Sequence, residues 1–87
     1  MTMEEVINSA LVVARYLQKR RPGARCFPVA EPRVIKELLD HGLRISEEPE
    51  EIDVVVIAFD RTFDYRKLNI AYRASLHGAD LIATNPD

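Results

Sequence analysis

Three charged residues that could take part in chemistry follow the most apolar segment of the chain. Asp60, Arg61 and Asp64 come directly after residues 52–59, which read IDVVVIAF. Open parallel sheets place their ligand sites at the carboxyl ends of the strands, so these three residues are candidates for a binding site. Two alternatives stay open, because Asp64 could serve only as the N-cap of a following helix and Arg61 only as a surface charge.

The other residues of catalytic type have structural interpretations. His41 and His77 each precede a glycine at the expected end of a helix, where the helix dipole stabilises an imidazolium. Ser9 and Ser75 lie on predicted helices without the nearby base that a serine nucleophile needs. The three glycines are isolated, and no His/Cys set has metal-ligand spacing. The sequence therefore predicts neither a phosphate-binding loop nor a metal site.

Three helices are predicted from capping signals and apolar periodicity. Thr2 and Glu5 have the spacing of a capping box, in which the hydroxyl and the carboxylate satisfy backbone N–H groups at the start of a helix. The expected helices begin after Thr2, Glu31 and Asp64 and end before Gly23, Gly42 and Gly78.

Three strands are expected, over residues 26–30, 52–59 and 80–84. The second is β-branched and almost continuously apolar, which is typical of a strand covered on both faces of a parallel sheet. Pro28 cannot donate a ladder hydrogen bond, which places it at an edge, a bulge or a strand end. The order α-β-α-β-α-β predicts an α/β fold, a small three-layer domain with a mostly parallel three-stranded sheet flanked by helices.

Length and composition narrow the possible classes of protein. The 87 residues fit a single domain over 1–87, with a lead-in helix over 1–22 and a βαβαβ portion over 24–87. A net charge of −2 argues against a nucleic-acid partner. The only cysteine is Cys26, which favours a reducing, cytoplasmic compartment. No apolar run is long enough to cross a bilayer, and Glu4 and Glu5 stand where a signal peptide would be basic.

The second half of the chain also carries an ordered set of residues. Residues 54–87 read VVVIAFDRTFDYRKLNIAYRASLHGADLIATNPD. They resemble the cap-domain signature of the NagD-like, p-nitrophenylphosphatase branch (subfamily IIA) of the haloacid dehalogenase superfamily, in which a strand leads to G-L-D-R-x-F-x-Y-x-K-L, a helix and G-A-x-F-I-A-T-N-P-D. The residues in register are Asp60, Arg61, Phe63, Tyr65, Lys67, Leu68, Ala71, Gly78, Ala79, Ile82, Ala83, Thr84, Asn85, Pro86 and Asp87.

The upstream half is similar to the family more weakly. Residues 9–17 resemble the helix that leads into the cap, and residues 24–43 resemble its first strand–helix unit. The chain departs from the signature at Ala58, where the family usually has glycine, and at Phe59, where it usually has an aliphatic residue. Residues 26–30 read CFPVA in place of a pattern such as V-Y-V-I-G, so the first strand is expected to be less regular than in relatives.

The resemblance implies a role in substrate selection. Members of the family carry an Asp nucleophile with a second Asp as acid/base, a Ser/Thr motif, a Lys and a magnesium-binding acidic motif, and none of these lies within the 87 residues. The chain is thus expected to be the cap of a magnesium-dependent phosphatase for small phosphate monoesters, inert alone and without catalytic residues. The implied substrate-binding residues are Phe59, packing on the leaving group, with Asp60, Arg61, Thr84, Asn85 and Asp87.

The expected partners are a small phosphorylated metabolite, for the full-length enzyme, and either a second copy of the chain or a core domain. One alternative is a stand-alone module that forms homo-oligomers or binds proteins without catalysis. Another is a receiver-like or flavodoxin-like binding domain, although the first predicted strand lacks a following Gly-rich or acidic-triad loop.

Overall fold

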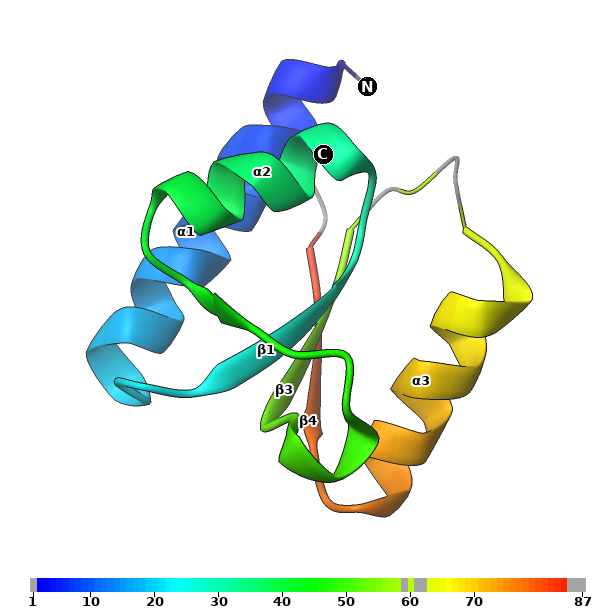
Figure 1. The fold of residues 1–87 in the computed structure, drawn as a ribbon. Coiled ribbons are helices and arrows are strands. Elements are labelled where there is room, and N and C mark those ends of the chain that lie inside the picture. Colours follow the sequence, from blue (N-terminus) through cyan, green and yellow to red (C-terminus); the bar gives the residue numbers. More distant parts are fainter. Residues whose placement is uncertain (1, 59, 61–62, 85–87) are drawn as a thin grey trace.

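The computed structural model describes residues 2–58, 60 and 63–84 (Figure 1). The elements in chain order are α1 (Met3–Arg20), β1 (Arg25–Val29), α2 (Pro32–Asp40), β2 (Arg44–Ile45), the 3₁₀ helix η1 (Pro49–Glu51), β3 (Val54–Ile57), α3 (Tyr65–Leu76) and β4 (Asp80–Ala83). In the described part of the chain, no helix is long and apolar enough to span a bilayer.

The sheet has four strands, so the prediction of three strands was wrong. The strand order is β2-β1-β3-β4, and all three pairings are parallel, as expected. The additional, unpredicted strand is β2, which pairs only Arg44 and Ile45 with Arg25 and Cys26 of β1. Two residues are too few to show an alternating pattern, so the pairing, rather than the local sequence, defines this strand.

Pro28 lies on the flank of β1 that β2 leaves open. Ser46 N donates to Cys26 O on the β2 side (3.0 Å), whereas Ala58 N donates to Val29 O on the β3 side (3.0 Å). In a parallel strand the backbone N–H and C=O groups of alternate residues face the same neighbouring strand, so the backbone of Pro28 faces the β2 side, as that of Cys26 does. Pro28 lies beyond the two residues of β1 that pair with β2. The missing N–H therefore costs no ladder hydrogen bond, and the expected edge character of Pro28 holds locally.

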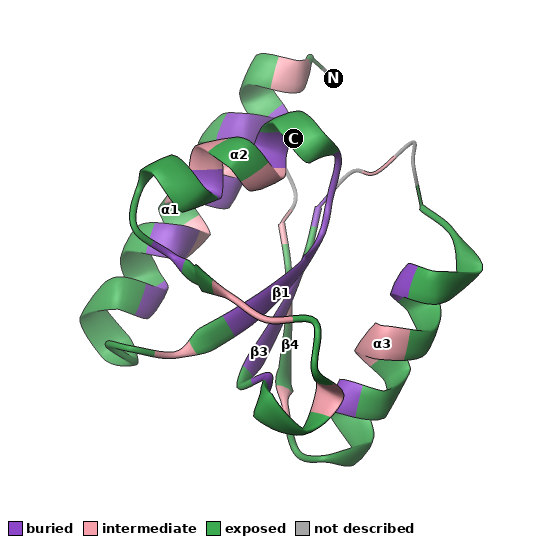
Figure 2. Ribbon diagram, viewed as in Figure 1, coloured by how far each residue is buried: buried purple, intermediate pink, exposed green. Residues whose placement is uncertain are grey.

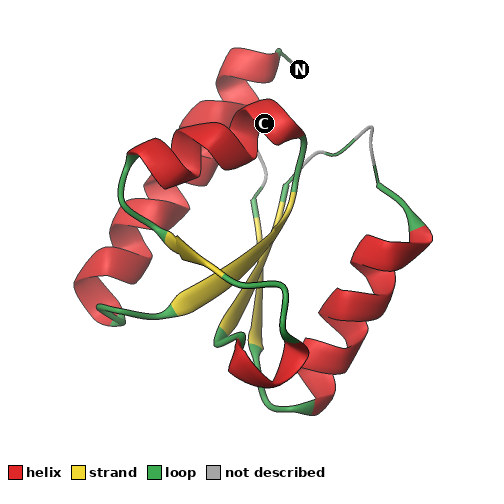
Figure 3. Cartoon of the chain, viewed as in Figure 1, coloured by secondary structure: helices red, strands yellow, loops and turns green. Residues whose placement is uncertain are grey.

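Helices cover both faces of the sheet, giving three layers (Figure 3). On one face, Val54 and Val56 of β3 pack in a cluster with Leu17 of α1, and a second cluster joins α1 to α2. On the other face, Val55 packs with Ala74 of α3. The buried residues of the sheet follow β1 and β3 through the centre of the molecule, whereas β4 is mostly exposed (Figure 2). A strand covered on both faces explains why residues 52–59 lack alternation.

The predicted helix boundaries are confirmed by their caps. Thr2 and Glu5 form the capping box of α1, with Glu5 N donating to Thr2 Oγ1 at 3.1 Å. Gly42 follows α2 with φ +86°, a left-handed conformation that glycine adopts without the strain of a Cβ. β1 has the expected five residues, shifted by one position, whereas β3 and β4 are shorter than expected; Ile52 and Ala58 lie buried in the connections on either side of β3.

Candidate functional site

The topology creates a switch point between β1 and β3. From β1 the chain moves through α2 on one face to β2, and from β3 it moves through α3 on the other face to β4 (Figure 1). The connections that leave the carboxyl ends of β1 and β3 therefore diverge, which is where open α/β sheets bind ligands. The described residues here are Ala30, Glu31, Ala58, Asp60 and, from α3, Lys67.

A buried ion pair connects the two sides of this switch point. Lys67 Nζ lies 2.8 Å from Asp60 Oδ2 and donates to Ala30 O at 3.3 Å. The Lys67 side chain is 11% exposed and the Asp60 side chain 3%. The contact joins the carboxyl end of β1, the β3–α3 connection and the first turn of α3. Buried charges need such partners, because an unpaired ion in a protein interior costs several kcal/mol.

The start of α3 fixes the backbone of Lys67. Asp64 Oδ1 accepts a hydrogen bond from Lys67 N at 2.9 Å, so the N-cap interpretation of Asp64 is confirmed. Lys67 and Ala74 are the buried residues of α3, and their spacing of seven places them on the same inner face. The helix thus directs a cation toward the switch point instead of the usual apolar side chain.

Glu31 adds a third ionisable group at the same edge. It is the N-cap residue of α2, directly after Ala30, and only 7% exposed. Glu31, Asp60 and Lys67 are the ionisable residues that the structure brings to the carboxyl ends of β1 and β3 within its described part.

Only part of the predicted site falls within the described residues. Asp60 is at the switch point, whereas Phe59, Arg61, Asn85 and Asp87 lie outside the residues that the structure describes. Thr84 follows β4 and its N–H donates to Ile57 O at 2.8 Å. Its Oγ1 is buried and has no hydrogen-bond partner among the described residues.

Sequence reasoning missed Lys67 as a site residue. It was matched only as a position of the family signature, yet its seven-residue spacing from Ala74 marks it as a cation on the inner face of a helix. The structural interpretation of His41 is supported, because its Nδ1 lies 2.8 Å from Glu37 O at the end of α2. His77 is likewise the C-cap residue of α3.

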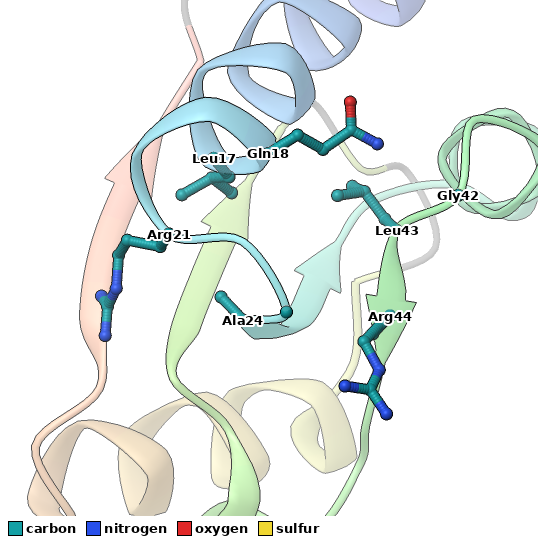
Figure 4. A pocket seen from close by; sticks show the side chains of 8 residues that line it. Leu17, Gln18, Arg21, Ala24, Gly42, Leu43 and Arg44 are labelled. Atoms are coloured by element: carbon teal, nitrogen blue, oxygen red, sulfur yellow. The ribbon is translucent and has the colours of Figure 1, made fainter.

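A small hollow lies near the opposite edge of the sheet, where the strands begin, between α1, β1 and β2. It encloses about 80 Å³ and is lined by Gln18, Arg21 and Arg44 among others. Figure 4 shows the two guanidinium groups on opposite sides of the hollow. Arg21 pairs with Asp80 at 2.6 Å and Gln18 donates to His41 O at 2.8 Å. Arg21 and Gln18 are thus engaged with other parts of the chain, and the groups around the hollow do not converge on one ligand site.

The chain matches phosphatases over nearly its whole length. The acid sugar phosphatase of Staphylococcus epidermidis is 39% identical over 84 residues, which are 97% of this chain and 32% of that protein. The 4-nitrophenylphosphatase of Thermotoga maritima is 34% identical with a TM-score of 0.80, over 91% of this chain and 30% of that one. A nagD protein is 34% identical with a TM-score of 0.79 over the same shares.

The chain is similar to one segment of NagD-like phosphatases. The resemblance to this branch of the haloacid dehalogenase superfamily, drawn from residues 54–87, is therefore confirmed, and it extends to 91% of the chain in three dimensions. No protein-family model matches the chain. The chain spans about a third of the length of the curated relatives that it matches.

One structural neighbour was solved with magnesium. The glycerol phosphate phosphatase of Mycobacterium tuberculosis, in complex with magnesium, is 28% identical with a TM-score of 0.69, over 95% of this chain and 25% of that one. The part of this chain that the structure describes has no group of three His, Cys, Asp or Glu residues arranged to hold a metal ion. These residues do not fit a magnesium site.

Proposed function

We propose that this chain is the cap, or substrate-specificity, portion of a NagD-like phosphatase that hydrolyses small phosphate monoesters with magnesium. The observation that carries the proposal is the match of 97% of the chain to 32% of an acid sugar phosphatase. The sequence itself supports it, because the 87 residues contain no Asp-x-Asp pair to act as nucleophile and acid/base. The chain alone is inert, and its contribution is to select the substrate.

The carboxyl edge of the sheet is the surface that faces the substrate in this proposal. A cap closes over a core active site, excludes water and contacts the leaving group, so it changes which ester is bound. The proposed contacts come from the loops after β3 and β4. They are Phe59, Asp60, Arg61, Thr84, Asn85 and Asp87.

The proposal includes one structural unit and one compartment. Residues 1–87 act as a single domain, in which residues 1–22 lead into the cap-like portion over 24–87. The packing of Val6, Ala10 and Ala14 of α1 in one core cluster with Val34 and Leu38 of α2 supports the single domain. The free thiol of Cys26 supports a reducing, cytoplasmic location.

A second candidate function is an interaction module without catalysis, which an exposed apolar stripe favours. Four residues on the outer face of α3 are between 49% and 81% exposed: Tyr65, Leu68, Tyr72 and Leu76. A helix that is apolar on both faces is usually covered on both. The cap proposal accounts for the stripe by contact with the core domain or with a second copy of the chain.

Two measurements test the cap proposal. The purified chain is expected to release no nitrophenol from p-nitrophenyl phosphate with magnesium, and saturable turnover that co-purifies with the chain would contradict the proposal. In a chimera, this chain replaces the matching 84 residues of the Staphylococcus epidermidis acid sugar phosphatase. The chimera is expected to hydrolyse p-nitrophenyl phosphate and to rank sugar and glycerol phosphates differently from its parent. A folded but inactive chimera would contradict the cap role.

A further inference from the structure

We propose that Lys67 is a positioning residue that sets the substrate selectivity of the cap by holding Asp60 against the carboxyl end of β1. The inference rests on the proposed function, since selectivity is a property of the cap together with a core. It concerns three described groups: Lys67 Nζ lies 2.8 Å from Asp60 Oδ2 and 3.3 Å from Ala30 O.

Hydrogen bonds hold both ends of the β3–α3 connection in place. Ala58 N donates to Val29 O at 3.0 Å, which ties the beginning of the connection to β1. Asp64 caps α3 through Lys67 N at 2.9 Å, which ties its end to the helix. Asp60 lies between these ends, and the ion pair with Lys67 Nζ at 2.8 Å is a third attachment. The ion pair between Lys67 and Asp60 thus holds the proposed substrate-facing connection at a point between its two ends.

Burial makes this attachment strong. The Asp60 side chain is 3% exposed, so it depends on charged and hydrogen-bonding partners rather than on water. Removing the ammonium takes away a charged partner of this buried carboxylate and so destabilises its buried position. Because Lys67 donates to Asp60 and Ala30, we assign it a positioning role that acts through Asp60.

A neighbouring ion pair provides the contrast. Arg66 pairs with Glu47 at 3.1 Å, but both side chains are 57% exposed. Such exposed pairs contribute little to stability and impose little on the backbone. Arg66→Met is therefore a matched control for Lys67→Met, because it removes a cation one position away on the same helix.

The test uses the active chimera with the variants Lys67→Met, Asp60→Asn, their combination and Arg66→Met. For each we would measure kcat and KM for p-nitrophenyl phosphate, glycerol 3-phosphate and a hexose phosphate, and check folding by urea unfolding. We expect Lys67→Met and Asp60→Asn each to change the ratio of kcat/KM between the hexose and the small esters by about tenfold or more, mainly through KM. The double variant should resemble either single one, since the two residues act as a unit. Arg66→Met should leave the ratio within about twofold.

The outcomes separate this inference from the proposed function. An active chimera whose ester ratios stay within about twofold in folded Lys67→Met and Asp60→Asn variants would contradict the inference alone. Equal losses for all esters would also contradict it, because they indicate general destabilisation. Asp60→Asn keeps the shape of the side chain, so it decides the question if Lys67→Met does not fold. An inactive, folded chimera without further substitution would contradict the proposed function and the inference together.

Discussion

The most informative residue in this chain is a charged side chain where an apolar one is expected. Lys67 lies on the inner face of α3, seven residues before Ala74, which is fully buried. Places where a sequence departs from its own local pattern are where function tends to be found. The partners of Lys67 join β1 to the β3–α3 connection, so the departure coincides with the topological switch point of the sheet.

The buried thiol of Cys26 predicts that the stability of the fold depends on pH. It is 1% exposed, and burial raises the pKa of its thiol, with Asp53 adding to the rise and Arg21 opposing it. A raised pKa means that the folded state holds its proton more tightly than the unfolded state. The resulting stability is fully present below the ordinary cysteine pKa of about 8.5 and is lost as pH rises through the folded value.

The measurement is the free energy of unfolding in urea between about pH 7 and pH 9.5. The unmodified chain should lose more stability across this interval than Cys26→Ala, which has no thiol to ionise. Parallel curves for the two proteins would show that Cys26 does not contribute to the pH dependence.

Phe59 carries a prediction for the active chimera. If Phe59 packs on the leaving group as proposed, Phe59→Ala should raise KM for esters with large leaving groups and change their ranking, because small esters do not use that contact. The measurement is kcat and KM over a series of phosphate esters of increasing size. If kcat fell equally for every ester, including the smallest, Phe59 would have no specific role in leaving-group binding.

At the scale of elements, α3 depends on its N-cap. Asp64→Ala should lower the free energy of unfolding by about 1 kcal/mol, because it removes the acceptor for Lys67 N. Asp64→Asn is the control, since asparagine is an equally good N-cap and should retain most of the stability. Urea unfolding of the three proteins decides between the N-cap and a role in binding alone. Equal stability of Asp64→Ala and the unmodified chain would contradict the N-cap contribution.

At the scale of the whole molecule, the layer formed by α3 exposes more large apolar side chains than the layer formed by α1 and α2. Besides the stripe on α3, Leu81 of β4 is 56% exposed and Ile57 of β3 is 38% exposed. In the described part of the chain β4 pairs only with β3, which leaves one flank of β4 as an unpaired strand edge. Open edges and large apolar patches are features that proteins usually cover.

We therefore expect the isolated chain to self-associate, most simply as a symmetric dimer. Sedimentation equilibrium over a roughly hundredfold range of concentration would show a mass rising above 9.9 kDa. Tyr72→Asp should weaken the association, whereas Val12→Asp, at an equally exposed position on α1, should not. A mass that stays at 9.9 kDa with cooperative unfolding would show that the chain covers its own apolar surface.

The sequence alone determined the features that local chemistry controls. The capping residues Thr2 and Asp64, the left-handed Gly42 and the apolar segment before Asp60 fixed the helices and the central strand, because each acts through neighbours in the chain. The density of the family signature over residues 54–87 was also sufficient to identify the kind of enzyme to which the chain is similar.

Only the tertiary structure decided what depends on contacts between distant segments. The strand β2 exists because Arg44 and Ile45 lie beside β1, and two residues carry no periodicity that could announce it. The role of Lys67 likewise depends on Asp60, seven residues away, and on Ala30, 37 residues away. A buried charge is tolerated only where such partners converge, and their convergence is a property of the fold rather than of any local sequence.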